Sequence, residues 1–142
     1  MTTCHGSYED LVADPNVDVV YVATPHPYHH RNALPAHRAG KHVLVEKPFA
    51  MDAREAAEII ACARENDLFV MEAMWARFLP HMRGVREVPA SGCLGTVTTV
   101  FAGHGQWFAP DSDFRLFAPK LGGGALLDLG IYPVSCAVLT RC

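Results

Sequence analysis

The triplet Glu46-Lys47-Pro48 follows the apolar run His42-Val43-Leu44-Val45 and places two opposite charges at the end of a predicted buried strand. An open α/β sheet forms its ligand crevice at the carboxyl ends of its strands. A lysine that is shielded from water in such a crevice can exchange protons near neutral pH. Taken alone, a Glu-Lys pair is better explained as a solvated ion pair of the surface. The triplet therefore raises two hypotheses, proton transfer by Lys47 or a surface ion pair.

A second group of polar residues, Asp128 and Tyr132, follows Gly122-Gly123-Gly124 on a predicted apolar helix. Because they are four residues apart, they share one helix face and can contact a common ligand. A carboxylate and a phenol on an apolar helix are costly unless each is hydrogen-bonded. In isolation they indicate a capping aspartate and a bonded tyrosine. The glycines could cradle phosphates, but the sequence has no GxxxxGK[ST] lysine, which argues against a P-loop.

Histidines are frequent in the first third of the chain and raise the question of a metal site. They are His26, His29, His30, His37 and His42. No cluster of carboxylates or thiols accompanies them, and HxxHH is not a recognised ligand spacing, so we expect no bound metal. We interpret His29 as a polar wall of the crevice, and His37 and His42 as surface residues.

Alternating strands and helices in the first half must position these side chains. Ser7 and Asp52 begin capping boxes, and Gly40 ends a helix that starts near Pro27. Strands are expected at 18–23, 42–45 and 68–71. Such β-α units imply a parallel sheet, whose carboxyl edge would carry Thr24-Pro25-His26, Glu46-Lys47-Pro48 and Glu72 to Trp75 in one row. The helix after Asp52 is expected to present one apolar face, made of Ala53, Ala56, Ala57, Ile60 and Ala63.

The second half of the chain has a different pattern. The β-branched segment 95–102 predicts a long strand, and an aromatic loop from Trp107 to Lys120 follows it. A helix is expected from Ala125 to about Leu139, kinked by Gly130 and Pro133. Prolines and glycines between residues 77 and 92 mark a domain boundary. We therefore divide the chain into residues 1–78 and 79–142.

Composition limits the class of protein. The chain has 142 residues, of which half are hydrophobic, and a net charge of −3 without a basic stripe, so we expect no nucleic-acid partner. The apolar stretches look far shorter than a membrane span, so we expect no membrane partner. Five cysteines, an odd number without a Cys-x-x-Cys motif, fit reduced thiols in the cytoplasm.

Four motifs in collinear order resemble the Gfo/Idh/MocA (glucose–fructose oxidoreductase / inositol dehydrogenase) family, and within it the branch of dihydrodiol and D-xylose dehydrogenases. The motifs are Ala23-Thr24-Pro25-His26-x-x-His29, Val45-Glu46-Lys47-Pro48, Glu72-Ala73-Met74-Trp75-Ala76-Arg77-Phe78-x-Pro80 and the segment from Gly122 to Tyr132. The resemblance implies an α/β fold. It would consist of a partial Rossmann-like parallel sheet, residues 1–78, and the start of an α/β substrate-binding and dimerisation domain, residues 79–142.

The resemblance also implies a reaction, hydride transfer between NAD or NADP and a hydroxyl-bearing carbon of a sugar or a cyclic trans-dihydrodiol. Alcohol oxidation releases a proton as the hydride leaves, and a phenol or an amine with a lowered pKa can accept it. In this reading Tyr132 is the acid/base, Lys47 favours the deprotonated phenol and positions the alcohol, and Asp128 orients the substrate.

The resemblance further implies where the cofactor binds. The nicotinamide end would be lined by Thr24, Pro25, His26, His29, Glu46 and Lys47, and the far wall by Trp75 and Arg77. It also implies a cis Lys47–Pro48 bond and a homodimer.

One family feature has no counterpart in this sequence, the G-x-G-x-x-G phosphate turn near the start of the Rossmann domain. We therefore expect a chain truncated at both ends that binds the cofactor weakly or not at all, because the turn supplies close backbone contacts to the pyrophosphate. Two alternatives stay open. The chain could be a non-catalytic ligand-binding module, or an interaction module that exposes strand 95–102.

Overall fold

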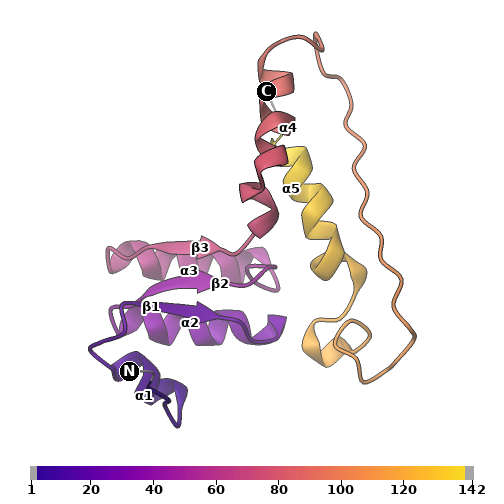
Figure 1. Ribbon diagram of the computed structural model, residues 1–142. Coiled ribbons are helices and arrows are strands. Elements are labelled where there is room, and N and C mark those ends of the chain that lie inside the picture. The colour runs from indigo at the N-terminus through magenta and orange to yellow at the C-terminus, as the bar shows by residue number, and fades with distance from the viewer. Residues whose placement is uncertain (1–2, 140–142) are drawn as a thin grey trace. The chain divides into compact units, whose positions relative to one another are not determined.

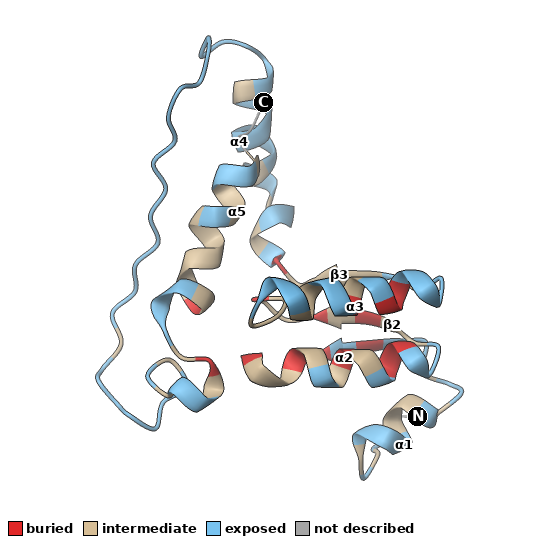
Figure 2. Ribbon diagram, turned by 180° about the vertical axis from the view of Figure 1, so that it is seen from behind, coloured by how far each residue is buried: buried red, intermediate tan, exposed pale blue. Residues whose placement is uncertain are grey.

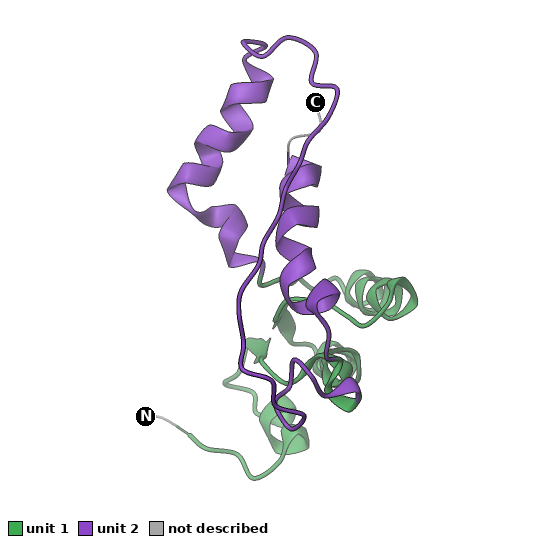
Figure 3. Ribbon diagram, turned by 90° about the vertical axis from the view of Figure 1, so that its right-hand side faces the viewer, with its two compact units in different colours: residues 1–73, 120–122 green, residues 74–119, 123–142 purple. Residues whose placement is uncertain are grey.

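The computed structural model describes residues 3–139 (Figure 1), and the chain divides into two compact units (Figure 3). The first unit comprises Met1–Ala73 with Lys120–Gly122, and the second comprises Met74–Pro119 with Gly123–Cys142. The domain division at residues 78 and 79 stays a prediction.

A three-stranded parallel sheet in the order β1-β2-β3 forms the first unit (Figure 1), which confirms the predicted α/β class. Its register aligns Val22 with Val45 and Val45 with Glu72, so the three strand ends lie at one edge. The elements are α1 (Tyr8–Ala13), β1 (Val19–Val22), η1 (His26–Tyr28), α2 (His29–Arg38), β2 (His42–Val45), α3 (Ala53–Glu65) and β3 (Val70–Glu72).

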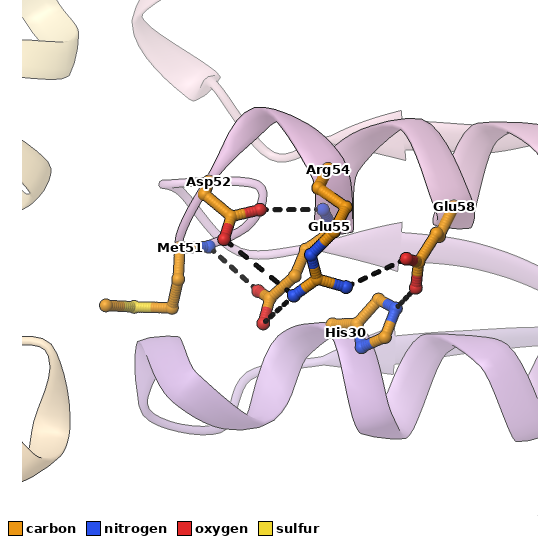
Figure 4. Close-up of polar contacts among 6 residues, drawn as sticks. All are labelled: His30, Met51, Asp52, Arg54, Glu55 and Glu58. Carbon is orange, nitrogen blue, oxygen red and sulfur yellow. Dashed lines mark hydrogen bonds and ion pairs between the residues drawn. The ribbon is translucent and has the colours of Figure 1, made fainter.

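The predicted helix ends are confirmed by their capping contacts. The Ser7 hydroxyl accepts a hydrogen bond from the Asp10 N–H at 3.0 Å, and the Asp52 carboxylate accepts one from the Glu55 N–H at 2.8 Å (Figure 4). Each side chain satisfies a backbone donor that the first helical turn leaves unpaired. Gly40, with a φ of 77°, follows the end of α2.

The core of the first unit lies between the sheet and helices α2 and α3, which cover the same face of the sheet (Figures 1 and 2). Strand β1 buries Val20 and Val22 toward these helices, while Val19 and Tyr21 on its opposite face are 57% and 53% exposed. This alternation is the period of two that a strand with one covered face requires.

An exposed polar contact joins the two helices across their outer surface. Glu58 of α3 lies 2.7 Å from His30 of α2 and 2.8 Å from Arg54 one turn earlier (Figure 4). Hydrogen bonding from Arg54, and then from His30, lowers the pKa of the Glu58 carboxyl. The contact therefore favours a charged Glu58.

Two expectations about side-chain burial are wrong. Helix α3 buries Ile59, Cys62 and Ala63, whereas Ala53 and Ala57 are exposed. The neighbouring isoleucines 59 and 60 allow two apolar stripes on this helix, and packing against the sheet selects the one that contains Ile59. His37, expected at the surface, is fully buried because α2 turns its side chain toward the core.

The regular elements of the second unit, among its described residues, are helices. Its elements include η2 (Trp75–Phe78), α4 (Pro80–Ala90), a π-helical turn η4 (Leu126–Gly130) and α5 (Ile131–Leu139), and a short η3 (Pro119–Leu121) precedes the glycine triplet. Pro80 occupies the first turn of α4, where its missing N–H costs nothing. A helix thus occupies most of the region that we expected to be a punctuated connection.

The predicted strand at 95–102 is wrong. This segment has no regular secondary structure, and the side chain of Phe101 is 95% exposed. A strand needs a neighbour for its backbone donors and acceptors, and no strand within residues 3–139 pairs with this segment. Its β-branched composition alone therefore does not produce a strand.

The apolar C-terminal region is longer than the sequence suggested. By length and composition the 21-residue helical run Pro119–Leu139 could cross a membrane, which corrects our estimate of the apolar stretches. Core helices of soluble proteins meet the same criteria. The run is interrupted at the glycine triplet and contains Asp128, a buried carboxylate. The absence of a membrane partner stays a prediction.

Candidate functional site

Lys47 lies in the segment Glu46–Phe49 after β2, which we call the lysine loop. Its Lys47–Pro48 peptide bond is cis, as expected. The main-chain N–H of Lys47 donates to the Glu46 carboxylate at 3.0 Å. The loop thus begins with a local contact that fixes the backbone of the lysine itself.

Two side chains from other elements hold the next two residues of the lysine loop. The carbonyl oxygen of Pro48 lies 2.8 Å from Nδ1 of His29, which belongs to α2. The N–H of Phe49 donates to the carboxylate of Glu72, the last residue of β3, at 2.9 Å. The main chain is therefore anchored at three successive residues, and the path of the backbone on both sides of Lys47 is fixed.

The neighbouring strand end carries Thr24, Pro25 and His26. The Thr24 carbonyl lies 2.7 Å from Nε2 of His29, and its hydroxyl accepts a hydrogen bond from Asn32 at 3.2 Å. Pro25 is exposed and precedes η1. His26 is buried, with Nδ1 3.3 Å from the Gly122 carbonyl. His29 therefore contacts the segment after β1, at Thr24, and the segment after β2, at Pro48.

Glu46 was expected to line the nicotinamide end of the cofactor site. In the structure its carboxylate accepts hydrogen bonds from two residues of the first unit. One oxygen accepts from the Lys47 N–H, and the other accepts from the Tyr21 hydroxyl on β1. The hydrogen bond that the Tyr21 hydroxyl donates to Glu46, followed by burial and the negative charge of Glu46, raises the pKa of Tyr21. These contacts tie the end of β2 to β1.

The first glycine of the triplet is required by packing within the first unit. A Cβ on Gly122 would lie 2.9 Å from the sulfur of Met51 and 3.1 Å from Cβ of His26. Gly122 also has a φ of 72°, in the left-handed region. From the sequence we placed this glycine before a predicted helix and weighed a phosphate-binding role for the triplet, and the sequence carried no sign of its contact with Met51.

Asp128, in the second unit, is 3% exposed and pairs with an arginine that sequence reasoning missed. The guanidinium of Arg115 lies 2.9 Å from the Asp128 carboxylate. The N–H groups of Gly123 and Gly124 donate to the carbonyls of Ala118 and Leu116 at 3.1 and 2.9 Å. These bonds hold the turn that carries Arg115 against the start of the helix with Asp128. The two amides therefore have backbone partners here.

Tyr132 contacts two aromatic residues of its own unit. Its hydroxyl accepts a hydrogen bond from the indole of Trp75 at 3.1 Å, and the His104 ring lies 5.0 Å from the phenol ring. The phenol also lines a cavity of about 400 Å³, which Arg77 lines as well. Trp75 and Arg77, expected at the cofactor's far wall, are thus neighbours of Tyr132.

The predicted site residues are divided between the two units. Lys47 and the cofactor residues of the strand ends belong to the first unit, and Asp128, Tyr132, Trp75 and Arg77 belong to the second. Their union in one catalytic centre stays a prediction. Among residues 3–139, no group of three or more His, Cys, Asp or Glu is placed to hold a metal ion.

Sequence comparison gives two family matches. Residues 2–74 match the oxidoreductase family with an NAD-binding Rossmann fold, and residues 82–140 match the GFO/IDH/MocA C-terminal domain. Both matches agree with the resemblance that the four motifs indicated.

The curated relatives are dehydrogenases of sugars and diols. The chain is 45% identical over 139 residues to D-xylose 1-dehydrogenase (NADP(+)) of Hypocrea jecorina, with 92% of this chain and 36% of that protein covered. It is 42% identical over 135 residues to trans-1,2-dihydrobenzene-1,2-diol dehydrogenase of Danio rerio, with 95% and 40% covered. The chain thus spans less than half the length of these relatives.

Solved structures of the same kind are similar in fold. Aldose-aldose oxidoreductase from Caulobacter crescentus, complexed with glycerol, is 34% identical with a TM-score of 0.86, over 94% of this chain and 40% of that one. The 3-ketoreductase KijD10 from Actinomadura kijaniata, in complex with NADP and TDP-benzene, is 36% identical with a TM-score of 0.78, over 94% and 41%.

Proposed function

Because the chain belongs to the Gfo/Idh/MocA oxidoreductase family, we propose that it carries the reaction centre of an NAD(P)-dependent dehydrogenase. The observation that carries this proposal is the lysine loop, whose main chain is anchored on both sides of Lys47 at the carboxyl edge of a parallel sheet. Open parallel sheets bind nucleotides at this edge. Anchoring of this kind holds the backbone of a residue that must support charge and position a bound alcohol.

The residues of the sheet edge fit the nicotinamide end of the cofactor. Thr24 and Lys47 follow adjacent parallel strands and offer a hydroxyl and an amine to a polar ligand. Bound NAD(P) supplies the hydride acceptor for the reaction. We propose that Thr24, Pro25, His26, His29, Glu46 and Lys47 form this end of the cofactor site, with Trp75 and Arg77 farther along it.

The proton of the reaction belongs to Tyr132 in this proposal. Oxidation of an alcohol requires that its hydroxyl proton leave, and Tyr132 accepts it at the phenol oxygen. To accept the proton, Tyr132 must be the phenolate, and the indole N–H of Trp75, 3.1 Å from that oxygen, stabilises its negative charge and orients the ring. Lys47 supports the same charge and positions the alcohol.

Asp128 orients the substrate hydroxyl in this scheme. Its carboxylate is buried and bonded to Arg115, which keeps the charge in place and fixes the side chain for a hydroxyl donor. Arg115 is therefore a positioning residue, and it holds Asp128 rather than contacting the reacting atoms.

The substrate class follows from the relatives. Both curated relatives are named for a hydroxyl-bearing substrate, a pentose and a cyclic trans-diol, and the Caulobacter enzyme was solved with glycerol. We propose a sugar or a cyclic trans-dihydrodiol as the substrate, and NADP or NAD as the cofactor. We further propose that the protein is cytoplasmic and homodimeric. The odd number of cysteines supports the first of these proposals.

A chimera tests the proposed function. The matching segment of Hypocrea D-xylose 1-dehydrogenase is replaced by this chain, and NADP⁺ reduction is followed with D-xylose. We expect an active chimera in which Tyr132→Phe lowers kcat by about 10²–10⁴-fold, as for the loss of a general acid or base, and in which Lys47→Met also lowers kcat, because the phenolate loses its supporting charge. The isolated 142-residue chain is titrated with NADPH in parallel.

Matched controls come from the same elements. Lys41 lies at the opposite end of β2, where its amine donates to the Asp14 carbonyl at 2.8 Å, so Lys41→Met should leave kcat unchanged. Tyr8, which is 60% exposed, gives the corresponding control Tyr8→Phe. An active chimera whose Lys47 and Tyr132 variants keep full kcat would contradict the proposal and favour a non-catalytic ligand-binding module.

A further inference from the structure

Helix α2 carries two fully buried histidines with different surroundings. His29 and His37 both have an exposed fraction of 0%. Both ring nitrogens of His29 face backbone carbonyl oxygens, Nδ1 at 2.8 Å from Pro48 and Nε2 at 2.7 Å from Thr24. His37 has one such contact, between Nδ1 and the Lys41 carbonyl at 3.1 Å. Two donating ring nitrogens would therefore satisfy the contacts of His29, whereas one donating nitrogen satisfies those of His37.

A carbonyl oxygen only accepts hydrogen bonds, so a ring nitrogen that lies against it has to donate. A neutral imidazole has one N–H and one lone pair, while an imidazolium has two N–H groups. A neutral His29 would direct a lone pair at a carbonyl oxygen less than 3 Å away in a site without solvent exposure. We propose that His29 carries both ring protons in the folded chain and donates one to each carbonyl.

The same reasoning gives His37 the opposite state. One N–H satisfies the Lys41 carbonyl, and among the described residues Nε2 has no hydrogen-bond partner. The pKa of His37 is lowered, because the effect of burial is larger than the opposing effect of the hydrogen bond to Lys41, which raises the pKa. His37 is therefore the neutral reference for His29 on the same helix.

Charged side chains occur on the segments that His29 joins and on the elements next to them. Glu46 precedes Lys47 in the lysine loop, and Glu72 of β3 bonds the residue that follows Pro48, so two carboxylates and one amine border this segment. From η1, the His26 ring lies 5.9 Å away, edge-on. On the helix surface, His30 is paired with Glu58. Helix α2 itself also carries Arg31 and Arg38, and the Arg31 guanidinium lies 4.0 Å from the centre of the Tyr28 ring.

A doubly protonated His29 acts as a positioning residue. Its two charge-assisted hydrogen bonds tie the end of β1 at Thr24 to the lysine loop at Pro48, and such bonds are stronger than neutral ones. The consequence for Lys47 rests on the proposed function, whereas the protonation state does not. His29 thus joins the two strand ends that the proposal assigns to the cofactor and to the catalytic lysine.

The test is nuclear magnetic resonance of the unmodified 142-residue chain, with ¹⁵N-labelled histidine and ¹³C-carbonyl-labelled proline, at a pH of about 7.5, above the usual histidine midpoint of about 6.5. Nδ1 of His29 lies against the Pro48 carbonyl, so a coupling between a ring nitrogen and a proline carbonyl across that bond identifies the His29 signals. We expect two proton-bearing nitrogens for His29 and no lone-pair nitrogen signal. A second sample with labelled threonine should show the coupling to Thr24.

His37 is the control within the same spectra. Its ring should show one protonated and one lone-pair nitrogen, and His37→Gln should remove that pair of signals. A lone-pair nitrogen in the His29 ring at this pH, or a coupling to only one of the two carbonyls, would overturn the proposal. Neither result depends on NADPH or on activity, so a failed activity test of the proposed function leaves this inference untouched.

Discussion

Replacing Glu72 with alanine should free the lysine loop at Phe49. The carboxylate of Glu72 accepts the Phe49 N–H at 2.9 Å, and hydrogen bonds to charged groups contribute about 1.5–3 kcal/mol. Glu72 is only half-buried, so we take the lower end, about 1.5 kcal/mol. Since 1.4 kcal/mol corresponds to a factor of ten, local opening of this bond should become about tenfold more frequent.

Amide hydrogen exchange measures this opening directly, because each amide reports the free energy of the fluctuation that exposes it. The Phe49 amide should exchange about tenfold faster in Glu72→Ala than in the unmodified chain. Glu72→Gln keeps an acceptor oxygen without the charge, and neutral hydrogen bonds contribute about 0.5–1.5 kcal/mol, so it should fall between the two. The Leu68 amide, bonded to the Ala63 carbonyl at 2.9 Å, should not change.

Two results would refute this reasoning about the loop. One is an unchanged Phe49 exchange rate in Glu72→Ala, which would mean that another contact holds the loop. The other is equal acceleration at Phe49 and Leu68, which would mean that Glu72 stabilises the whole unit rather than the lysine loop.

Three further predictions concern the packing around the site. Ile59→Ala, at a fully buried position, should lower the free energy of unfolding in urea by about 2–5 kcal/mol. Gly123→Ala should speed amide exchange at Gly124, because the new Cβ would lie 2.8–2.9 Å from backbone atoms of the preceding turn, whereas Gly103→Ala, with open space around it, should not. The lowered pKa of His37 means that the unfolded chain binds its proton more readily. Stability should therefore fall as pH drops below about 6.5, and His37→Gln should flatten this slope of the unfolding free energy against pH.

Features set by neighbouring residues were predictable from the sequence. The caps at Ser7 and Asp52 use a side chain and an amide three residues apart, and the strands of the first unit are short β-branched runs between turn residues. Parallel order follows from the alternation of strands with helices. Each of these features depends on residues within one element or on the connection between two.

Features set by distant partners were not predictable. The bond between Phe49 and Glu72 joins residues 23 positions apart and depends on the register of β2 and β3. The burial of His37 depends on how α2 rotates on the sheet. Segment 95–102 has strand composition without a strand to pair with among the described residues. In each case a local pattern allows two outcomes, and tertiary contacts decide between them.

In the motif Glu46-Lys47-Pro48, two residues make contacts that fix the backbone, and the residue between them has the proposed functional role. Glu46 accepts the main-chain N–H of Lys47 and the hydroxyl of Tyr21, and Pro48 offers its carbonyl to His29. These two residues thus fix the backbone, and Lys47 between them is the residue whose side chain is proposed to support the Tyr132 phenolate and position the alcohol. A surface ion pair would need only the two charges, whereas these contacts use the Glu46 carboxylate and the main-chain carbonyl of residue 48. The contacts of this motif therefore fix the backbone position of Lys47.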